Sequence, residues 1–306
     1  MSWKSFLWGI LSVILIALTF IYWVMPFNEI RFGTFGGSSS PEFSVGNLTN
    51  SMQFYPNMRF PEKKISYKIE NGCSLKKKKE MEDAFSFLQG ETNLTFYPVV
   101  SGEEVTVSCD EETKTNDNGM FIAGEGGPTK ILSGENFNVI YTGKILLLRE
   151  SNCERPNVEV HELLHVLGFK HSKNKNNIMY PVSKCSQTLG TEIPEKINEL
   201  YSFESLADIR LENVSASISG RYLNLNASVQ NIGLKDSPSE TLKIYGDDEL
   251  IKEMPLKEIK VGYGLTVSLT NIWVSKRKIN KLKITVETPK SELSLNNNQV
   301  VLLTSS

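Results

Sequence analysis

The hydrophobic and polar positions of the chain form three successive patterns. Residues 6–27 contain no charged side chain and, at about 1.5 Å per residue in a helix, are long enough to cross a bilayer. Between residues 64 and 205, segments that alternate in polarity like strands are mixed with segments whose apolar residues recur at helical spacing. Beyond residue 206 the pattern is that of strands throughout. The chain is therefore predicted to contain an N-terminal transmembrane helix, an α+β domain with a partly antiparallel sheet and an all-β sandwich.

The apolar N-terminal segment indicates a single-pass signal-anchor over residues 1–28. Tryptophan or tyrosine lies near both ends of the segment, as in interfacial anchors, and Lys4 is the only basic residue before it. This charge favours a cytoplasmic N-terminus, which places the rest of the chain outside the cell membrane. A cleaved signal peptide and a secreted protein are the alternative, although the apolar run is long for one and no small-x-small cleavage site follows it.

The remaining boundaries follow from changes in composition. Glycine and serine are frequent from residue 31 to residue 43, which predicts a flexible spacer and a linker over residues 29–58. We expect an α+β domain over residues 59–205 and a β-sandwich over residues 206–306. In the first domain a helix should follow Ser74, and the polar segment 110–134 should be a long surface loop. The strands expected in the two domains cover residues 64–70, 94–100, 105–109, 138–148, 216–231, 242–245, 265–274 and 282–287.

Charge gives no reason to expect a nucleic-acid partner. The formal net charge is -2, and such binding depends on clustered lysine and arginine. The one basic cluster, residues 76–79, is interpreted as the solvated start of a helix.

Two features agree with export of the folded region that follows the N-terminal segment. Four sites match the N-glycosylation pattern, although such short motifs also occur by chance, and they begin at Asn47, Asn93, Asn213 and Asn226. The four cysteines, Cys73, Cys109, Cys153 and Cys185, suit two disulfides in an oxidising compartment. Three pairings exist. We favour Cys73 with Cys109 and Cys153 with Cys185, because each pair then closes a local unit, and four buried free thiols are the alternative.

All three histidines of the chain lie in the segment HELLHVLGFKH. His161 and His165 are four residues apart, so on a helix they project from one face and can bind one metal ion. A catalytic zinc site needs three protein ligands and one open position. Gly168 suits the end of the helix because it accepts a positive φ, and His171 follows as the third ligand. Glu162, next to these ligands, is the expected general base that takes a proton from water.

This segment resembles the HExxHxxGxxH signature of the metzincin zinc peptidases, and NIMYP at residues 177–181 resembles their Met-turn. Ser172 after the third histidine and the sequence MYP are most similar to the matrixin branch. The resemblance implies a zinc endopeptidase that cleaves protein or peptide substrates. It also implies that Met179 forms an apolar floor beneath the metal and that Pro181 begins one wall of the specificity pocket. A final helix is expected over residues 194–203.

Departures from the family limit the cofactors that we expect. No histidine remains for a structural zinc, so one catalytic Zn²⁺ is predicted. No segment resembles the cysteine switch of matrixin propeptides. Pro181 takes the place of the extra tyrosine ligand found in some relatives. The sequence gives no support for calcium, because the acidic residues Asp110, Glu111, Glu112 and Asp117 are interpreted as a solvated loop.

The strands beyond residue 206 resemble the CARDB type of immunoglobulin-like module, on segments such as ASVQNIG at residues 227–233. Such a module serves as a spacer or stabiliser, or it binds a substrate or a cell-surface partner. Two functions are therefore weighed. The first is an active, membrane-anchored zinc endopeptidase outside the cytoplasm, with an aminopeptidase or another zinc hydrolase as lesser variants. The second is a catalytically idle binding or adhesion protein that acts through the β-sandwich. The intact Glu162 favours the first.

Overall fold

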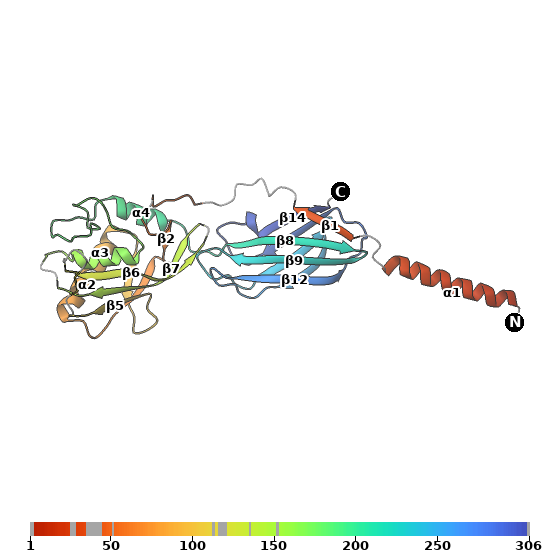
Figure 1. The fold of residues 1–306 in the computed structure, drawn as a ribbon, viewed down its shortest axis with the longest axis horizontal. Coiled ribbons are helices and arrows are strands. Elements are labelled where there is room, and N and C mark those ends of the chain that lie inside the picture. The colour runs from red at the N-terminus through yellow and green to blue at the C-terminus, as the bar shows by residue number, and fades with distance from the viewer. Residues whose placement is uncertain are drawn as a thin grey trace. The chain divides into compact units, whose positions relative to one another are not determined.

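The computed structural model describes residues 3–24, 29–34, 45–50, 52–111, 114–115, 121–134, 136–150 and 153–304. The chain divides into two units, shown in Figure 1. The α/β unit consists of residues 44–207 with residues 232–235. The β unit consists of residues 1–43, 208–231 and 236–306. Each unit has its own hydrophobic core.

The N-terminal helix α1 extends over Trp3–Val24. Its side chains are described at Trp3 and from residue 7 to residue 20, and all of these are exposed. Within the described part of the chain, no helix has the length and apolar character that a membrane span requires. The transmembrane segment expected over residues 6–27 stays a prediction from the sequence. Its residues 25–27 lie outside the described residues.

The α/β unit is built on a mixed sheet, as the alternation of strand and helix patterns predicted. The strands lie in the order β2-β7-β5-β3-β4, all parallel, and β6 pairs antiparallel with β7. The elements are β2 (Met58–Arg59), β3 (Lys64–Ile69), β4 (Thr95–Pro98), β5 (Val105–Cys109), β6 (Gly124–Ser133) and β7 (Asn138–Leu147), with helices α2 (Leu75–Glu91), α3 (Asn157–Val166) and α4 (Glu192–Leu200).

Helix α2 begins where its sequence indicates. The Ser74 hydroxyl accepts a hydrogen bond from the Lys77 N–H at 3.2 Å and so caps the helix. The apolar residues at helical spacing, Met81, Ala84, Phe85 and Leu88, are buried in the core of the α/β unit. The last helix, α4, covers Glu192–Leu200 rather than residues 194–203. Pro194 is its third residue, a position in the first turn where a backbone N–H has no partner within the helix.

The lysine cluster at residues 76–79 is not solvated throughout, which corrects the prediction. Lys77 is buried, and its ammonium group donates to the carbonyl oxygens of Asp110 at 3.0 Å, Leu147 at 3.3 Å and Leu148 at 3.4 Å. Asp110 follows β5, and Leu147 ends β7. Lys77 therefore joins α2 to the ends of two neighbouring strands.

The surface loop expected over residues 110–134 is wrong for its second half, which forms strand β6. Glycine is frequent in surface loops, but two glycines of this segment are needed where the strand packs against α3. A Cβ atom at Gly126 would lie 2.3 Å from the carbonyl oxygen of Glu162, and one at Gly124 would lie 2.8 Å from the Glu162 Cγ. Residues 112–113 and 116–120 of this segment lie outside the described residues.

The linker expected over residues 29–58 is wrong at both of its ends. Strand β1 (Glu29–Thr34) pairs antiparallel with β8 (Ile209–Ser219) and with β14 (Gln299–Thr304), so its backbone hydrogen bonds belong to the β unit. At the other end, Gln53 and Met58 are buried in the α/β unit. Residues 35–44 and 51 lie outside the described residues.

The β unit consists of antiparallel strands that enclose one core. The strand order is β11-β10-β13-β14-β1-β8-β9-β12, with β9 (Tyr222–Asn231), β10 (Thr241–Gly246), β11 (Glu249–Pro255), β12 (Gly264–Trp273), β13 (Lys281–Glu287) and the 3-10 helix η1 (Asn296–Asn298) before β14. Alternate residues of β9 and β10 are buried, which is the period of a strand with one face in the core. The strand expected over residues 216–231 is two strands, since the chain turns at Gly220, whose φ is +64°.

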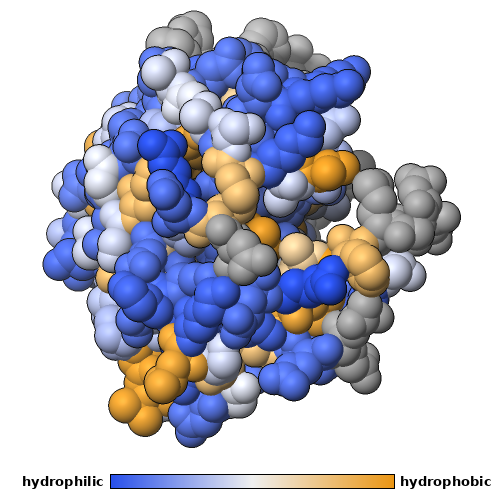
Figure 2. Space-filling model, turned by 90° about the vertical axis from the view of Figure 1, so that its left-hand side faces the viewer, coloured by the Kyte–Doolittle hydropathy of each residue, from blue (hydrophilic) through white to orange (hydrophobic). Residues whose placement is uncertain are grey.

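Two disulfides tie the α/β unit, in the pairing favoured from the sequence. Cys73 is bonded to Cys109 and joins the start of α2 to the end of β5. Cys153 is bonded to Cys185 and joins the segment before α3 to the segment before α4. Hydrophilic residues cover most of the face of this unit seen in Figure 2, with apolar residues in separate groups.

Candidate active site

Helix α3 carries the first two histidines. His161 and His165 lie one turn apart and are buried, while the apolar residues between them, Leu163 and Leu164, belong to the core. Burial of this apolar face fixes the rotation of the helix, and it therefore fixes the side of the helix from which both imidazoles project.

The end of α3 returns the chain towards these histidines. Gly168 has a φ of +88°, its N–H donates to the carbonyl of His165, and the N–H of Phe169 donates to the carbonyl of Leu164. This is the Schellman arrangement that ends many helices. A Cβ atom at Gly168 would lie 2.8 Å from the sulfur of Met58. Both the backbone angle and the space therefore require glycine at this position.

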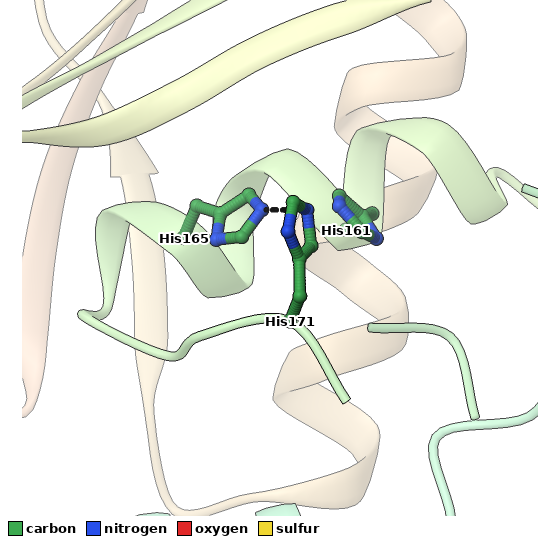
Figure 3. A group of neighbouring side chains, drawn as sticks. All are labelled: His161, His165 and His171. Carbon is green, nitrogen blue, oxygen red and sulfur yellow. Dashed lines mark hydrogen bonds between the residues drawn. The ribbon is translucent and has the colours of Figure 1, made fainter. Parts of the chain in front are cut away.

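The three histidines converge, as Figure 3 shows. One ligand atom of each residue lies within 4.8 Å of the others, and the Nε2 atoms of His165 and His171 are 3.1 Å apart. In the described part of the chain, this is the group of histidine, cysteine or acidic side chains whose geometry suits one metal ion. The turn at Gly168 thus brings His171 to the face of α3 that carries the other two.

Backbone carbonyls orient two of the rings. The Nδ1 atom of His161 lies 2.7 Å from the carbonyl oxygen of Ile178, and that of His165 lies 2.7 Å from the carbonyl oxygen of Phe169. A carbonyl oxygen only accepts, so Nδ1 carries the hydrogen in both rings and Nε2 keeps its lone pair. This is the support that metal-binding histidines commonly have.

The protonation state of the rings suits metal binding. Burial and the neighbouring His161 lower the pKa of His165 to about 4. Burial also lowers the pKa of His161 and that of His171. At neutral pH the imidazoles are therefore uncharged, which is the form that binds a metal.

The donor set fits zinc. Zinc binds histidine nitrogens at about 2.0–2.1 Å in a tetrahedral arrangement, which separates two ligand nitrogens by about 3.3 Å. The 3.1 Å between the Nε2 atoms of His165 and His171 is close to this value. Three nitrogen ligands leave one tetrahedral position open, as catalytic zinc sites require.

Glu162 lies between the two helical ligands in sequence and is buried. Burial raises its pKa to about 8, and the negative charges of Glu125 and Glu159 act in the same direction. A cation bound at the histidines would favour the ionised carboxylate, because opposite charges attract. The packing of Gly124 against this side chain restricts where the carboxylate can lie.

The segment 177–181, which resembles a Met-turn, contacts the same helix. Met179 is buried, its N–H donates to the Asn177 side chain at 2.8 Å, and its carbonyl accepts from the Ser172 N–H at 2.7 Å. The residue before it, Ile178, supplies the carbonyl that orients His161. The segment after His171 and the Met-turn therefore hold one another in place.

Other predicted residues lie on the surface. Pro181 is exposed two residues beyond Met179, and its role in a specificity pocket stays a prediction. The four candidate glycosylation sites, Asn47, Asn93, Asn213 and Asn226, are exposed as well. The acidic residues Glu112 and Asp117 lie outside the described residues.

Sequence reasoning missed one part of the site. Phe54 stacks on the ring of His165 with 6.0 Å between ring centroids, and its N–H donates to the carbonyl of Gly168 at 2.8 Å. The N–H of Lys170 donates to the carbonyl of Met52 at 2.8 Å. The segment 52–54, interpreted as a linker, therefore pairs with the turn that delivers His171. No motif or periodicity in these few residues indicated it.

Two family models match the chain. The Matrixin model (Peptidase_M10) matches residues 59–202, and the CARDB model matches residues 209–301. No curated protein has a sequence that matches this chain.

Several solved structures are similar to parts of the chain. The hatching enzyme high choriolytic enzyme 1 of the medaka fish Oryzias latipes, a zinc protease, is 18% identical over 45% of this chain, with a TM-score of 0.25. The match covers 55% of the hatching enzyme, so this chain spans about half its length. A CARDB domain of a Pyrococcus furiosus protein in complex with di-metal ions is 16% identical over 32% of this chain and 88% of its own, with a TM-score of 0.27. A domain of a putative cell surface protein from Methanosarcina acetivorans is 18% identical over 33% of this chain and 93% of its own, with a TM-score of 0.28.

The two family models confirm the resemblance found in the sequence: residues 59–202 match the matrixin family, and residues 209–301 match the CARDB family.

Proposed function

We propose that this protein is a zinc-dependent endopeptidase that hydrolyses peptide bonds outside the cytoplasm. The observation that carries the proposal is the convergence of His161, His165 and His171, with two of the rings held by backbone carbonyls so that Nε2 is free for a metal. The match of residues 59–202 to the matrixin family agrees with this chemistry.

Glu162 is the proposed general base. A zinc ion at the three histidines supplies Lewis acidity towards water and towards the carbonyl of the scissile bond. Glu162 takes the proton of the attacking water on its carboxylate and delivers it to the nitrogen of the leaving amine. Its burial suits this task, because a raised pKa brings proton uptake and release closer to neutral pH.

The outer edge of β6 is the proposed place of the substrate. Among the described strands, β6 pairs with β7 alone, and Gly126 packs against the carbonyl of Glu162. A peptide that adds a strand to this edge would receive backbone hydrogen bonds from β6. The close packing of β6 on α3 would hold such a peptide beside the helix that carries His161 and His165.

The location of the protein is proposed from the sequence. Residues 6–27 are uncharged, and Lys4 favours a cytoplasmic N-terminus. The two disulfides and the four exposed glycosylation motifs suit an oxidising, extracytoplasmic compartment. We therefore propose a cell-membrane anchor, with a secreted form if the segment is cleaved. The β unit serves as a spacer or binds a cell-surface partner.

The second candidate is an idle relative that binds through the β unit. The match of residues 209–301 to CARDB, a module without a catalytic motif, is the observation that favours it. The presence of Glu162 beside an intact set of three histidines favours the enzyme, because an idle site has no need of the base.

Cleavage of a peptide library by the full-length chain, kept in mild detergent, tests the proposal. The zinc-loaded protein is incubated with peptides from a digested proteome, and new ends are identified by mass spectrometry. We expect internal cleavages that disappear after chelation and fall by about 10²–10⁴-fold in Glu162→Gln. The exposed Glu192→Gln serves as the matched control and should cleave normally. A folded protein with one zinc and no cleavage would favour the idle binding protein.

A further inference from the structure

The sheet of the β unit contains one strand from a distant part of the sequence. Strand β1 lies between β14 and β8 (Figure 1) and pairs antiparallel with both. On their other sides, β14 pairs with β13 and β8 pairs with β9. Within the described sheet, β1 is therefore the link between the strands β11-β10-β13-β14 and the strands β8-β9-β12.

The two pairings of β1 meet at Phe32. The first part of the strand pairs with β8 and the last part pairs with β14. Phe32 has a partner on each side, Ala216 of β8 and Thr304 of β14. Its side chain is 8% exposed and belongs to the core of the β unit. The strand thus passes from one half of the sheet to the other at the residue whose side chain enters the core.

The rest of the core does not come from β1. Among the described core residues of the β unit, all except Phe32 lie between Ile209 and Leu302. The match to the CARDB family, over residues 209–301, also excludes β1. Strand β1 therefore adds Phe32 and backbone pairing to a core that one later part of the sequence builds. Loss of β1 removes a single side chain from the described core and leaves the others in place.

We propose that the facing edges of β8 and β14 form an acceptor for residues 29–34, which holds the N-terminal segment to the β unit without a covalent bond. Without β1, backbone N–H and C=O groups of both edges lose their partners, and an extended peptide restores them. The core position of Phe32 selects one register for that peptide, because a slip by one residue would turn the ring out of the core. The occupant is the chain's own segment, since its covalent link keeps it at a high effective concentration.

The acceptor changes what a break in the chain does. Residues 35–43, which contain glycine and serine, connect β1 to the α/β unit in sequence. After a break there, the α/β unit stays bonded to the β unit through the peptide bond between Ala207 and Asp208, while the N-terminal segment is held by strand pairing alone. With the membrane anchor proposed above, the protein then leaves the membrane only when β1 also leaves the sheet. This consequence rests on the proposed location, whereas the strand pairing does not.

Cutting the full-length chain between β1 and the α/β unit tests the acceptor. The chain carries Glu162→Gln to prevent self-cleavage, an N-terminal affinity tag, and a recognition sequence for a specific protease inserted after Ser39. After the cut, in mild detergent, the tagged fragment is captured and the body that stays with it is measured at a series of dilutions. We expect most of the body to be retained at about 10 μM protein. An excess of a synthetic peptide of residues 27–37 should release it, and a scrambled peptide should not.

Two variants make the result specific. Phe32→Asp places a charge at the core position and should weaken retention by about 30-fold or more, as expected of a central interface residue. Before the cut, this variant should still show cooperative thermal unfolding of the β unit. Leu250→Asp, at an exposed position of the same unit, should retain the body as the parent does.

Three results would overturn the proposal. They are release of the body from the parent fragment at once after the cut, equal retention by Phe32→Asp and the parent, and an unfolded β unit in uncut Phe32→Asp. The last would show that β1 is needed for the core to form. None of these measurements depends on peptidase activity, so they stand apart from the test of the proposed function.

Discussion

The Nδ1 atom of His161 lies 2.7 Å from the carbonyl oxygen of Ile178, which joins the metal-binding helix directly to the residue before Met179. His165 has the same relationship to Phe169, at the turn that follows the helix. The backbone around the site thus selects the tautomer of both rings before any metal binds. A fixed ring loses less conformational freedom when a metal binds than a mobile one does.

Loss of the third histidine should abolish stable zinc binding. His171→Ala leaves two ligands on α3, and because the chain has no other histidine, none can replace it. We expect zinc affinity to fall by about 100-fold or more, since even changes to the supporting groups of such sites cost 10–100-fold. Zinc content after dialysis against a weak chelator, measured by plasma mass spectrometry, gives the result. The exposed neighbour Lys170→Ala should retain one zinc, and equal zinc in both variants would contradict the assignment.

The contact between β6 and α3 should depend on one glycine and not on its neighbour. In Gly126→Ala the new Cβ would lie 2.3 Å from the carbonyl oxygen of Glu162, so the strand or the helix must move. At Gly127 no atom lies within 4 Å of the added Cβ. We expect Gly126→Ala to destabilise the α/β unit by roughly 1–3 kcal/mol and Gly127→Ala to have little effect.

Thermal unfolding and peptide cleavage together measure this contrast. Movement of β6 away from α3 should lower cleavage by Gly126→Ala even at a temperature where the variant is folded. Normal cleavage by a folded Gly126→Ala would indicate that this contact does not position the substrate or Glu162. Equal destabilisation by both alanines would show that backbone flexibility, rather than the close approach, explains the glycines.

The sequence predicted those residues of the site that lie close together along the chain. His161, His165, Gly168 and His171 lie within eleven residues, and helix periodicity with one turn determines how they meet. The contribution of Phe54 depends on pairing with a segment more than 100 residues away, which no local pattern encodes. Glycine occurs in loops and also where a strand approaches another backbone closely, so the polar, glycine-containing segment of β6 predicts a loop as readily as a strand.

The buried lysine of α2 should matter far more than the lysine beside it. Lys77→Met keeps the length of the side chain but leaves the carbonyls of Asp110, Leu147 and Leu148 without their charged donor. We expect a loss of about 1–3 kcal/mol in the free energy of unfolding of the α/β unit. Lys78→Met, on the less buried neighbour, should change it by less than about 0.5 kcal/mol. Denaturant unfolding checks the difference, and similar losses would show that Lys77 does not hold the strands.

The β unit was predictable in class but not in its closing strand. Alternation of buried and exposed residues indicated most of its strands, because one face of each lies in the core. Strand β1 is separated from its partners β8 and β14 by the whole α/β unit in sequence, so its pairing could not be anticipated.

The stability of the β unit should fall as the pH rises from about 4.5 to about 7. Burial, with repulsion between the carboxylates, raises the pKa of Glu240 and that of Glu292 from 4.5 to about 7. Over this range the unfolded chain releases these protons while the folded unit retains them, so the folded state binds more protons and loses stability with rising pH. Above pH 7 both states are ionised and the effect levels off. Melting temperatures of the β unit at pH 5 and pH 8 should therefore differ more for the parent than for Glu240→Gln/Glu292→Gln. The exposed pair Glu253→Gln/Glu258→Gln should keep the parental slope, and the same slope in all three proteins would mean that these two carboxyls do not control it.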